Sequence, residues 1–166
     1  MENEHQTEAL TNQQKYENYH EQCKRLNRAL ASGFNLEALF IEYALMEDRT
    51  ESVLKHAGMW DAYIKSRKGR NGNIDSKLRY IMKLAENKSC LLHKFFADDL
   101  LQQILDWKDE RNRLIHALLK QEFAHNEITN LAVRGKELSD KLKSQAGKYN
   151  RAADKKQMKE DKENEY

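Results

Sequence analysis

No proline interrupts the 166 residues of this chain, and only six residues are glycine. Strand-rich folds rely on glycine and proline to make their turns, so a chain with so few of them is poorly suited to sheets. The abundant Lys, Glu, Gln, Leu and Ala residues favour helices. The sequence therefore predicts an all-α protein, a bundle of about five to six helices.

The composition limits the size of the core and the kind of partner. Charged residues make up 34% of the chain and hydrophobic residues only 39%, which leaves a thin core for one domain of this length. A thin core combined with amphipathic helices suggests that a second subunit covers some apolar surface. The net charge of +2 does not by itself mark a dedicated nucleic-acid binder.

Three segments differ in their apolar pattern. Residues 1–34 are expected to form an N-terminal arm, with a helix over 13–31 whose apolar stripe is too narrow for the centre of a core. Residues 35–150 hold the helical domain, which ends in a long helix capped by Asn126. Residues 151–166 are a mixed-charge tail, expected to be a solvated helix extension or disordered.

Several features argue against a membrane, a disulfide or a metal. No stretch approaches the ~18 consecutive apolar residues of a membrane span, and the N-terminus is acidic. Cys23 and Cys90 are isolated and have no neighbours at zinc-ligand spacing, so they are expected to be reduced thiols. We expect a soluble, cytoplasmic protein without membrane, metal or cofactor.

The first helix of the domain, expected over 36–56 with Asn35 as its N-cap, has carboxylates near its apolar face. At 100° per residue, Glu47 falls in the middle of the apolar face, with Glu51 near its edge. That face is made by Leu36, Leu39, Phe40, Tyr43, Ala44, Leu54 and Ala57. A carboxylate at such a position is costly unless it is paired or used. Two interpretations stay open: a salt bridge to a core arginine or a dimer contact, or a functional acid that faces Arg111 or His116.

A loop over 65–73 concentrates positive charge. Lys65, Arg67, Lys68 and Arg70 lie close together among glycine and asparagine turn residues. The loop is either a solvated surface segment or a phosphate-contacting loop that holds RNA.

The most specific pattern lies within Trp107–Gln121, in the run RNRLIH from Arg111 to His116. A helix is expected over about 109–124, after a separate helix over 99–107, so that Asp109 is the N-cap and the run opens the helix. Arginine, asparagine and a histidine five positions after the arginine form the pattern R-N-x-x-x-H.

This pattern and its helical setting resemble the HEPN superfamily over about 35–150. Active members of that family are metal-independent endoribonucleases that build one composite cleft from two HEPN units. The resemblance implies an HEPN-like bundle, RNA as the substrate, a homodimer, and a role in a toxin or phage-defence system with an antitoxin or a larger defence effector as partner. Leu118 stands where the toxin branch has a tyrosine, which argues against membership of that branch.

Each residue of the motif suits a step of RNA cleavage. Histidine is the residue type suited to acid or base work near neutral pH, so His116 suits that role, and the planar guanidinium of Arg111 matches two phosphate oxygens. Asn112 suits a hydrogen bond that holds Arg111 or the phosphate. On one regular helix, however, positions five apart differ by about 140° in azimuth and roughly 7.5 Å in rise. Either Arg111 swings at the first helical turn, or a two-fold dimer brings two motifs together.

Two other interpretations of the motif remain. Arg111 is structural if it pairs with Asp109, Glu110 or Glu47 while His116 lies at a polar edge. In the second interpretation the chain is a non-catalytic helical module that binds RNA or docks onto a larger effector protein, and it keeps Arg111 and His116 for packing or RNA contact.

Overall fold

The computed structural model describes residues 10–118, 120 and 125–163, and within them it contains helices and no strand. The predicted all-α fold is therefore confirmed. Two short helices, α3 and α5, make the bundle richer in elements than expected. The described helices are α1 (Asn12–Ala31), α2 (Asn35–His56), α3 (Trp60–Ser66), α4 (Ile74–Ala85), α5 (Leu91–Phe96), α6 (Leu100–Ala117) and α7 (His125–Glu163).

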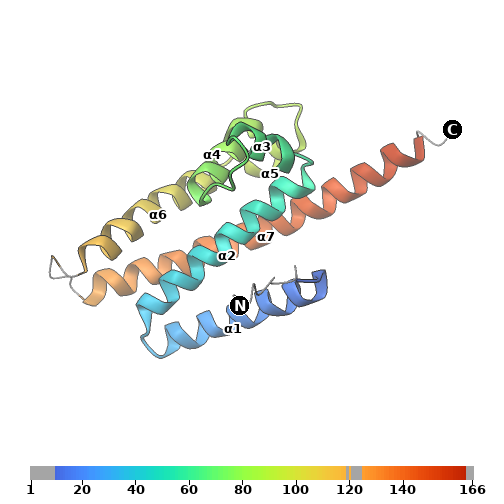
Figure 1. Cartoon of the computed structure of the whole chain (residues 1–166). Coiled ribbons are helices and arrows are strands. Elements are labelled where there is room, and N and C mark those ends of the chain that lie inside the picture. Colours follow the sequence, from blue (N-terminus) through green and yellow to red (C-terminus); the bar gives the residue numbers. More distant parts are fainter. Residues whose placement is uncertain (1–9, 119, 121–124, 164–166) are drawn as a thin grey trace, which may run out of the picture.

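The long helices α2 and α7 lie side by side through the middle of the bundle (Figure 1). Helix α1 packs on α2 at one side, whereas α4, α5 and α6 cover the other. Leu39, Leu54 and Leu142 are fully buried where these layers meet. Trp107 of α6 is also fully buried, and its indole Nε1 donates a hydrogen bond of 3.0 Å to the carbonyl oxygen of Leu131 in α7. The core thus ties α6 firmly to α7.

Helix α1 starts one residue before the predicted range and holds a capping box. The Thr11 hydroxyl accepts from the Gln14 backbone N–H at 3.2 Å, and the Gln14 side chain accepts from the Thr11 backbone N–H at 2.9 Å. Only Leu26 and Ala29 of this helix are buried. Helix α1 therefore lies at the periphery of the bundle, as its narrow apolar stripe predicts.

The prediction of two helices around Asp109 is wrong, because α6 runs without a break from Leu100 to Ala117. Asp109 is not an N-cap: its carboxylate lies 2.6 Å from Nζ of Lys108. That pairing, with the burial of Trp107, keeps the charged run WKDER helical. Arg111 therefore lies inside the helix rather than in its first turn. The predicted end of the motif helix, Leu119 and residues 121–124, falls outside the described residues.

The predicted face of α2 is wrong in part, although Leu39 and Leu54 of that face are buried as expected. Leu36 and Phe40 are exposed, and the fully buried carboxylate is Glu42 rather than Glu47. Asn35 lies inside the helix, where its side-chain amide donates to the Thr129 hydroxyl at 2.8 Å, and Phe34 occupies the N-cap position. Because α2 packs against α1, α3, α4 and α7, its buried positions are not confined to one stripe.

Helix α7 spans 39 residues, and it includes Asn126, which was predicted to cap it. The expected C-terminal tail is helical as far as Glu163. Gly135 lies where α7 comes closest to its neighbours: a Cβ there would be 2.1 Å from Oε2 of Glu42 and 2.8 Å from Cζ2 of Trp107. A residue without a side chain is required at this crossing.

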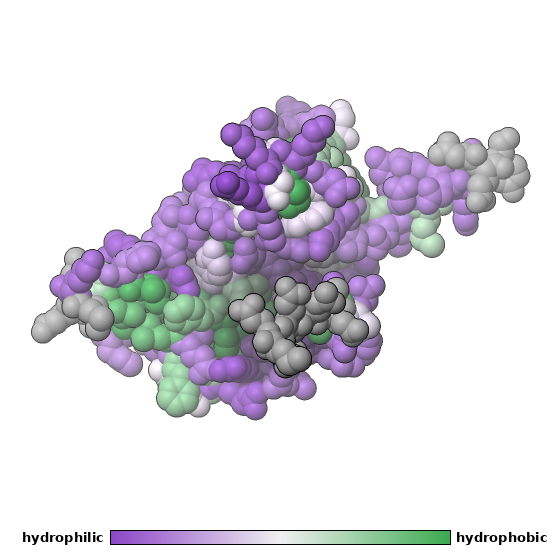
Figure 2. All heavy atoms as spheres, in the orientation of Figure 1, coloured by the Kyte–Doolittle hydropathy of each residue, from purple (hydrophilic) through white to green (hydrophobic). Residues whose placement is uncertain are grey.

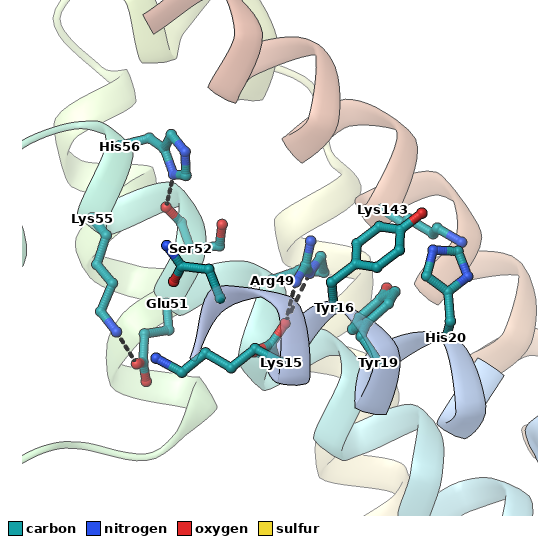
Figure 3. Close-up of a pocket in the computed structure, with 12 residues that line it drawn as sticks. Lys15, Tyr16, Tyr19, His20, Arg49, Glu51, Ser52, Lys55, His56 and Lys143 are labelled. Carbon is teal, nitrogen blue, oxygen red and sulfur yellow. Dashed lines mark hydrogen bonds and ion pairs between the residues drawn. The ribbon is translucent and has the colours of Figure 1, made fainter. Parts of the chain in front are cut away.

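Two surface features matter for function. Apolar atoms gather at the end of the molecule where α6 ends and where α2 and α7 begin (Figure 2). We call the exposed part of α2's start, Phe34, Leu36 and Phe40, the apolar end patch; these side chains are 62%, 37% and 54% exposed. A hollow of about 360 Å³, the α1 hollow, lies among α1, α2 and α7 (Figure 3). In the described ranges, no helix combines the length and apolar content needed to cross a bilayer.

Candidate functional site: an arginine over two aromatic rings

Arg111 lies half-buried on α6, with its guanidinium over two rings of α2. Its Cζ is 4.7 Å from the ring centre of Phe40 and 4.9 Å from that of Tyr43. Both distances are within the range of cation–π attraction. Nη1 donates a hydrogen bond of 3.0 Å to Oδ1 of Asn112, the adjacent residue of the motif. The structure therefore brings Arg111 and Asn112 together and holds the guanidinium at the edge of the apolar end patch.

The three carboxylates considered as structural partners of Arg111 are engaged elsewhere. Asp109 pairs with Lys108, Glu110 pairs with Arg134 of α7, and Glu47 lies 3.2 Å from Nζ of Lys77. None of the ion pairs among the described residues includes Arg111. The interpretation of Arg111 as the cation of one of these three salt bridges is wrong.

Burial lowers the pKa of Arg111 but leaves the guanidinium positively charged. Loss of solvent lowers the pKa of the guanidinium, and its buried Nε has no hydrogen-bond partner within the described part of the chain. An arginine nevertheless stays protonated in proteins. A desolvated cation with an unused donor and no carboxylate is well suited to an anionic ligand.

His116 is exposed on α6. Because α6 is continuous through Arg111 and His116, the two side chains leave the helix about 140° apart, with roughly 7.5 Å of rise between their positions. The swing of Arg111 at a first helical turn is therefore excluded as a way to join them. The two functional candidates do not form a pair within one chain.

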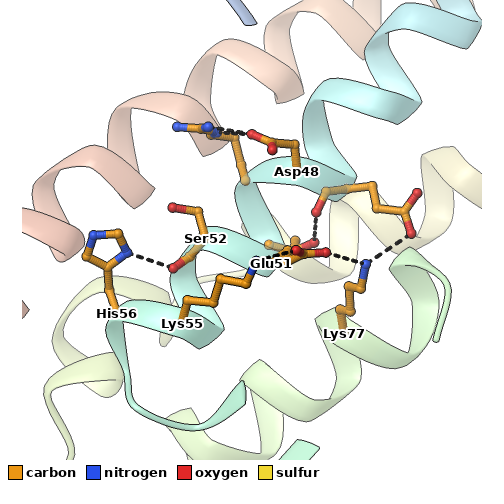
Figure 4. A network of polar contacts seen from close by, with 9 residues as sticks. Asp48, Glu51, Ser52, Lys55, His56 and Lys77 are labelled. Atoms are coloured by element: carbon orange, nitrogen blue, oxygen red, sulfur yellow. Dashed lines mark hydrogen bonds and ion pairs between the residues drawn. The ribbon is translucent and has the colours of Figure 1, made fainter. Parts of the chain in front are cut away.

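The predicted acids Glu47 and Glu51 both pair with Lys77, and Figure 4 shows Glu51 and Lys77 in this network. The Lys77 side chain is only 2% exposed, and its Nζ lies 3.2 Å from Oε1 of Glu47 and 3.3 Å from Oε2 of Glu51. Glu51 also accepts a hydrogen bond of 2.6 Å from Lys55. Desolvation alone would raise the pKa of Glu51, but the hydrogen bonds and charges of Lys55 and Lys77 lower it. The cation that holds these acids is a buried lysine of α4, rather than the expected core arginine.

The predicted basic loop begins inside α3, because Lys65 lies in the last turn of that helix. Lys65, Arg67, Lys68 and Arg70 are all exposed, and Lys68 has a left-handed backbone with φ of 54°. The loop ends at Asn73, whose side chain caps α4 by accepting from the Ser76 backbone N–H at 3.2 Å. No contact within the described ranges joins the four cations to Arg111 or His116, so their RNA-binding role stays a prediction.

One polar cluster near the motif was not predicted. Asp75, in the first turn of α4, accepts from Lys108 at 2.6 Å and from Arg79 at 2.9 Å. These hydrogen bonds lower the pKa of Asp75. The cluster fixes the start of α4 against α6, one turn before Arg111. Only the i, i+4 spacing of Asp75 and Arg79 was visible in the sequence, because Lys108 joins them from a distant segment.

Comparisons with protein-family models, with curated proteins and with solved structures find no match to this chain. Over the described ranges, no group of three or more His, Cys, Asp or Glu side chains is arranged to hold a metal ion. The chemistry available at the site is that of Arg111, Asn112 and His116.

Proposed function

We propose that this protein is a metal-independent endoribonuclease of the HEPN type that acts as a homodimer, in a toxin or phage-defence context. The observation that carries the proposal is the state of Arg111: a partly desolvated guanidinium, hydrogen-bonded to Asn112, whose nearby carboxylates are paired with other cations. RNA supplies the anion that such a group lacks.

The motif residues suffice for a transesterification. The ribose 2′-oxygen attacks the adjacent phosphorus, so a P–O2′ bond forms while the P–O5′ bond breaks. A base takes the 2′-hydroxyl proton and an acid delivers a proton to the departing 5′-oxygen, which are roles for the two His116 side chains of a dimer, one neutral and the other protonated. Arg111 stabilises the negative charge on the phosphorane oxygens. The products are a 2′,3′-cyclic phosphate and a 5′-hydroxyl.

A second copy of the chain is part of the proposal because of the helix geometry. One α6 directs Arg111 and His116 to different sides. A two-fold axis beside α6 lets the histidine of one copy work with the arginine of the other. The apolar end patch adjoins Arg111 through Phe40, so the surface that such a dimer would bury lies next to the motif.

Cleavage of single-stranded RNA in the presence of a chelator tests the proposal. Arg111→Ala and His116→Ala are each expected to lower the cleavage rate by about a hundredfold or more, because each removes a group that acts in the transition state. Arg113→Ala is the matched control: this arginine is exposed on the same helix and lies outside the motif pair. Products should carry 2′,3′-cyclic phosphate ends.

Circular dichroism and sedimentation show whether each variant keeps its fold and its oligomeric state. The proposal is refuted if the folded wild-type protein leaves RNA intact, or if Arg111→Ala and His116→Ala cleave as fast as Arg113→Ala.

A second candidate function is a non-catalytic helical module that binds RNA or docks onto a larger effector. The packing of Arg111 on Phe40 and Tyr43 favours it, since a guanidinium that lies on two rings also has a structural use. This module would bind RNA without cutting it, and Arg111→Ala would then reduce stability or affinity and leave no cleavage to measure.

A further inference from the structure

The α1 hollow gathers cations from three helices. Lys15 comes from α1, Arg49 and Lys55 from α2, and Lys143 from α7 (Figure 3). The hollow also contains Asp48 and Glu51, but Arg49 pairs with Asp48, and Lys55 pairs with Glu51 at 2.6 Å. No ion pair among the described residues includes Lys15 or Lys143. Two lysines therefore supply positive charge that no carboxylate of the hollow balances.

Two of these cations are held on one aromatic ring. Cζ of Arg49 is 4.1 Å and Nζ of Lys143 is 5.5 Å from the ring centre of Tyr19. Both cations line the hollow beside Tyr19, and an anion that binds in the hollow is attracted by both of them. Arginine and lysine on neighbouring helices are a suitable pair of contacts for a phosphate group.

Two aromatic side chains of α1, the exposed Tyr16 and the half-buried His20, line the hollow together with the cations. The rings of Tyr16 and His20 are 4.3 Å apart between centres and tilted by 57°, and Tyr16 is 61% exposed. Figure 3 shows the Tyr16 ring next to Arg49, with Lys143 on the far side of it. An exposed tyrosine ring is a surface on which a nucleobase stacks.

From this arrangement we infer that the α1 hollow is a nucleotide-binding site, in which Lys15, Arg49 and Lys143 contact the phosphate and Tyr16 stacks on the base. Its volume of about 360 Å³ lies within the range of small-ligand pockets, about 300–1,000 Å³, and suits a single nucleotide rather than a strand. The ligand has one chemistry, a phosphate joined to a nucleoside, and is either a free nucleotide or the end of an RNA strand. The site does not depend on the proposed ribonuclease activity, because none of its residues belongs to the motif.

Isothermal titration of the full chain with adenosine 5′-monophosphate, ribose 5-phosphate and inorganic phosphate tests the inference. The nucleotide is expected to bind saturably and about tenfold more tightly than ribose 5-phosphate, since only the nucleotide has a base that stacks on Tyr16. Tyr16→Ala should remove that difference and leave the affinity for ribose 5-phosphate unchanged. Lys143→Glu should weaken both ligands by about tenfold or more.

Lys24→Glu is the matched charge control, because the Lys24 side chain is on α1, 73% exposed and outside the hollow. The inference is overturned if the nucleotide does not bind saturably, if Lys24→Glu weakens it as much as Lys143→Glu does, or if Tyr16→Ala has no effect. A short single-stranded RNA, tested on the Arg111→Ala background so that it stays intact, separates the two sources. Binding of the RNA with the same response to Tyr16→Ala and Lys143→Glu supports an RNA end as ligand, whereas RNA that binds in the absence of nucleotide binding contradicts the inference.

Discussion

The sharpest test of the packing concerns Glu42, a carboxylic acid in the centre of the bundle. Glu42 is fully buried on α2, its Oε2 faces Gly135 of α7, and neither carboxyl oxygen has a hydrogen-bond partner within the described part of the chain. Burial raises the pKa of Glu42 from 4.5 to about 8, although the charge of Lys136 opposes this change. The carboxyl group is therefore neutral in the folded protein at pH 7.

The direction of the pH dependence follows from linkage. Below pH 4.5 the group is protonated in both states and has no effect on the free energy of unfolding. Between pH 4.5 and about 8 the unfolded chain releases the proton while the folded chain keeps it. Stability therefore falls as pH rises across this window, by at most about 1.36 kcal/mol per pH unit. The whole window is worth up to about 5 kcal/mol, a large part of the stability of a typical domain.

Urea unfolding at several pH values between 5 and 9 measures this effect on the wild type and on Glu42→Gln. The glutamine keeps the shape but does not titrate, so the variant should gain stability over the wild type as pH rises, by several kcal/mol at pH 8. Glu37→Gln, in the first turn of the same helix and partly exposed, is the control and should show no such trend. A difference between wild type and Glu42→Gln that stays constant from pH 5 to 9 would refute a buried neutral carboxyl.

Three further changes test other parts of the structure. Gly135→Ala places a Cβ 2.1 Å from Oε2 of Glu42 and should cost about 1–3 kcal/mol in urea unfolding, despite the better helix propensity of alanine; an unchanged stability would contradict the close crossing. Phe34→Asp, in the apolar end patch, should leave the fold intact but give a monomer by sedimentation that no longer cuts RNA; a monomer with full activity would contradict the two-copy site. Lys77→Ala leaves Glu47 and Glu51 without their shared cation and should cost about 1–3 kcal/mol at pH 7; the loss should shrink in acid, as the pH falls through the lowered pKa of Glu51, and a loss that is the same at pH 3 would exclude this pairing.

Much of the fold was predictable because helix formation here is controlled by local signals. The absence of proline and the scarcity of glycine indicate helices, and the narrow apolar stripe over 13–31 indicates a peripheral first helix. The end of α6 was harder: the charged run after Trp107 resembles a linker, although no glycine or proline breaks it. Lys108 is buried in that run, where it pairs with the adjacent Asp109 and with Asp75, 33 positions earlier. A contact between distant segments cannot be read from a local pattern.

The site was predictable only in part, for a related reason. The residues of the motif are evident in the sequence, but the rings that hold Arg111 are not, because Phe40 and Tyr43 lie on α2 and meet α6 only in the fold. A helical wheel drawn at 100° per residue places Glu47 at the centre of the apolar face of α2. In the fold, α2 is covered by other helices on several sides, and the carboxylate that it buries is Glu42. For a helix that is surrounded by neighbours, the period of the apolar residues no longer identifies the buried carboxylate.

The length of α7 has a mechanical consequence. Its last buried residue is Tyr149, and the helix continues to Glu163, projecting beyond the rest of the bundle (Figure 1). At about 1.5 Å per residue, the final ten residues extend roughly 15 Å as a single helix with water on most sides. Pairs along its own surface, such as Lys156 with Glu160 at 3.5 Å, support this segment instead of a core. Its backbone amides should exchange with deuterium far faster than those near Leu142, so this projecting end can be cut back, lengthened or tethered without disturbing the fold.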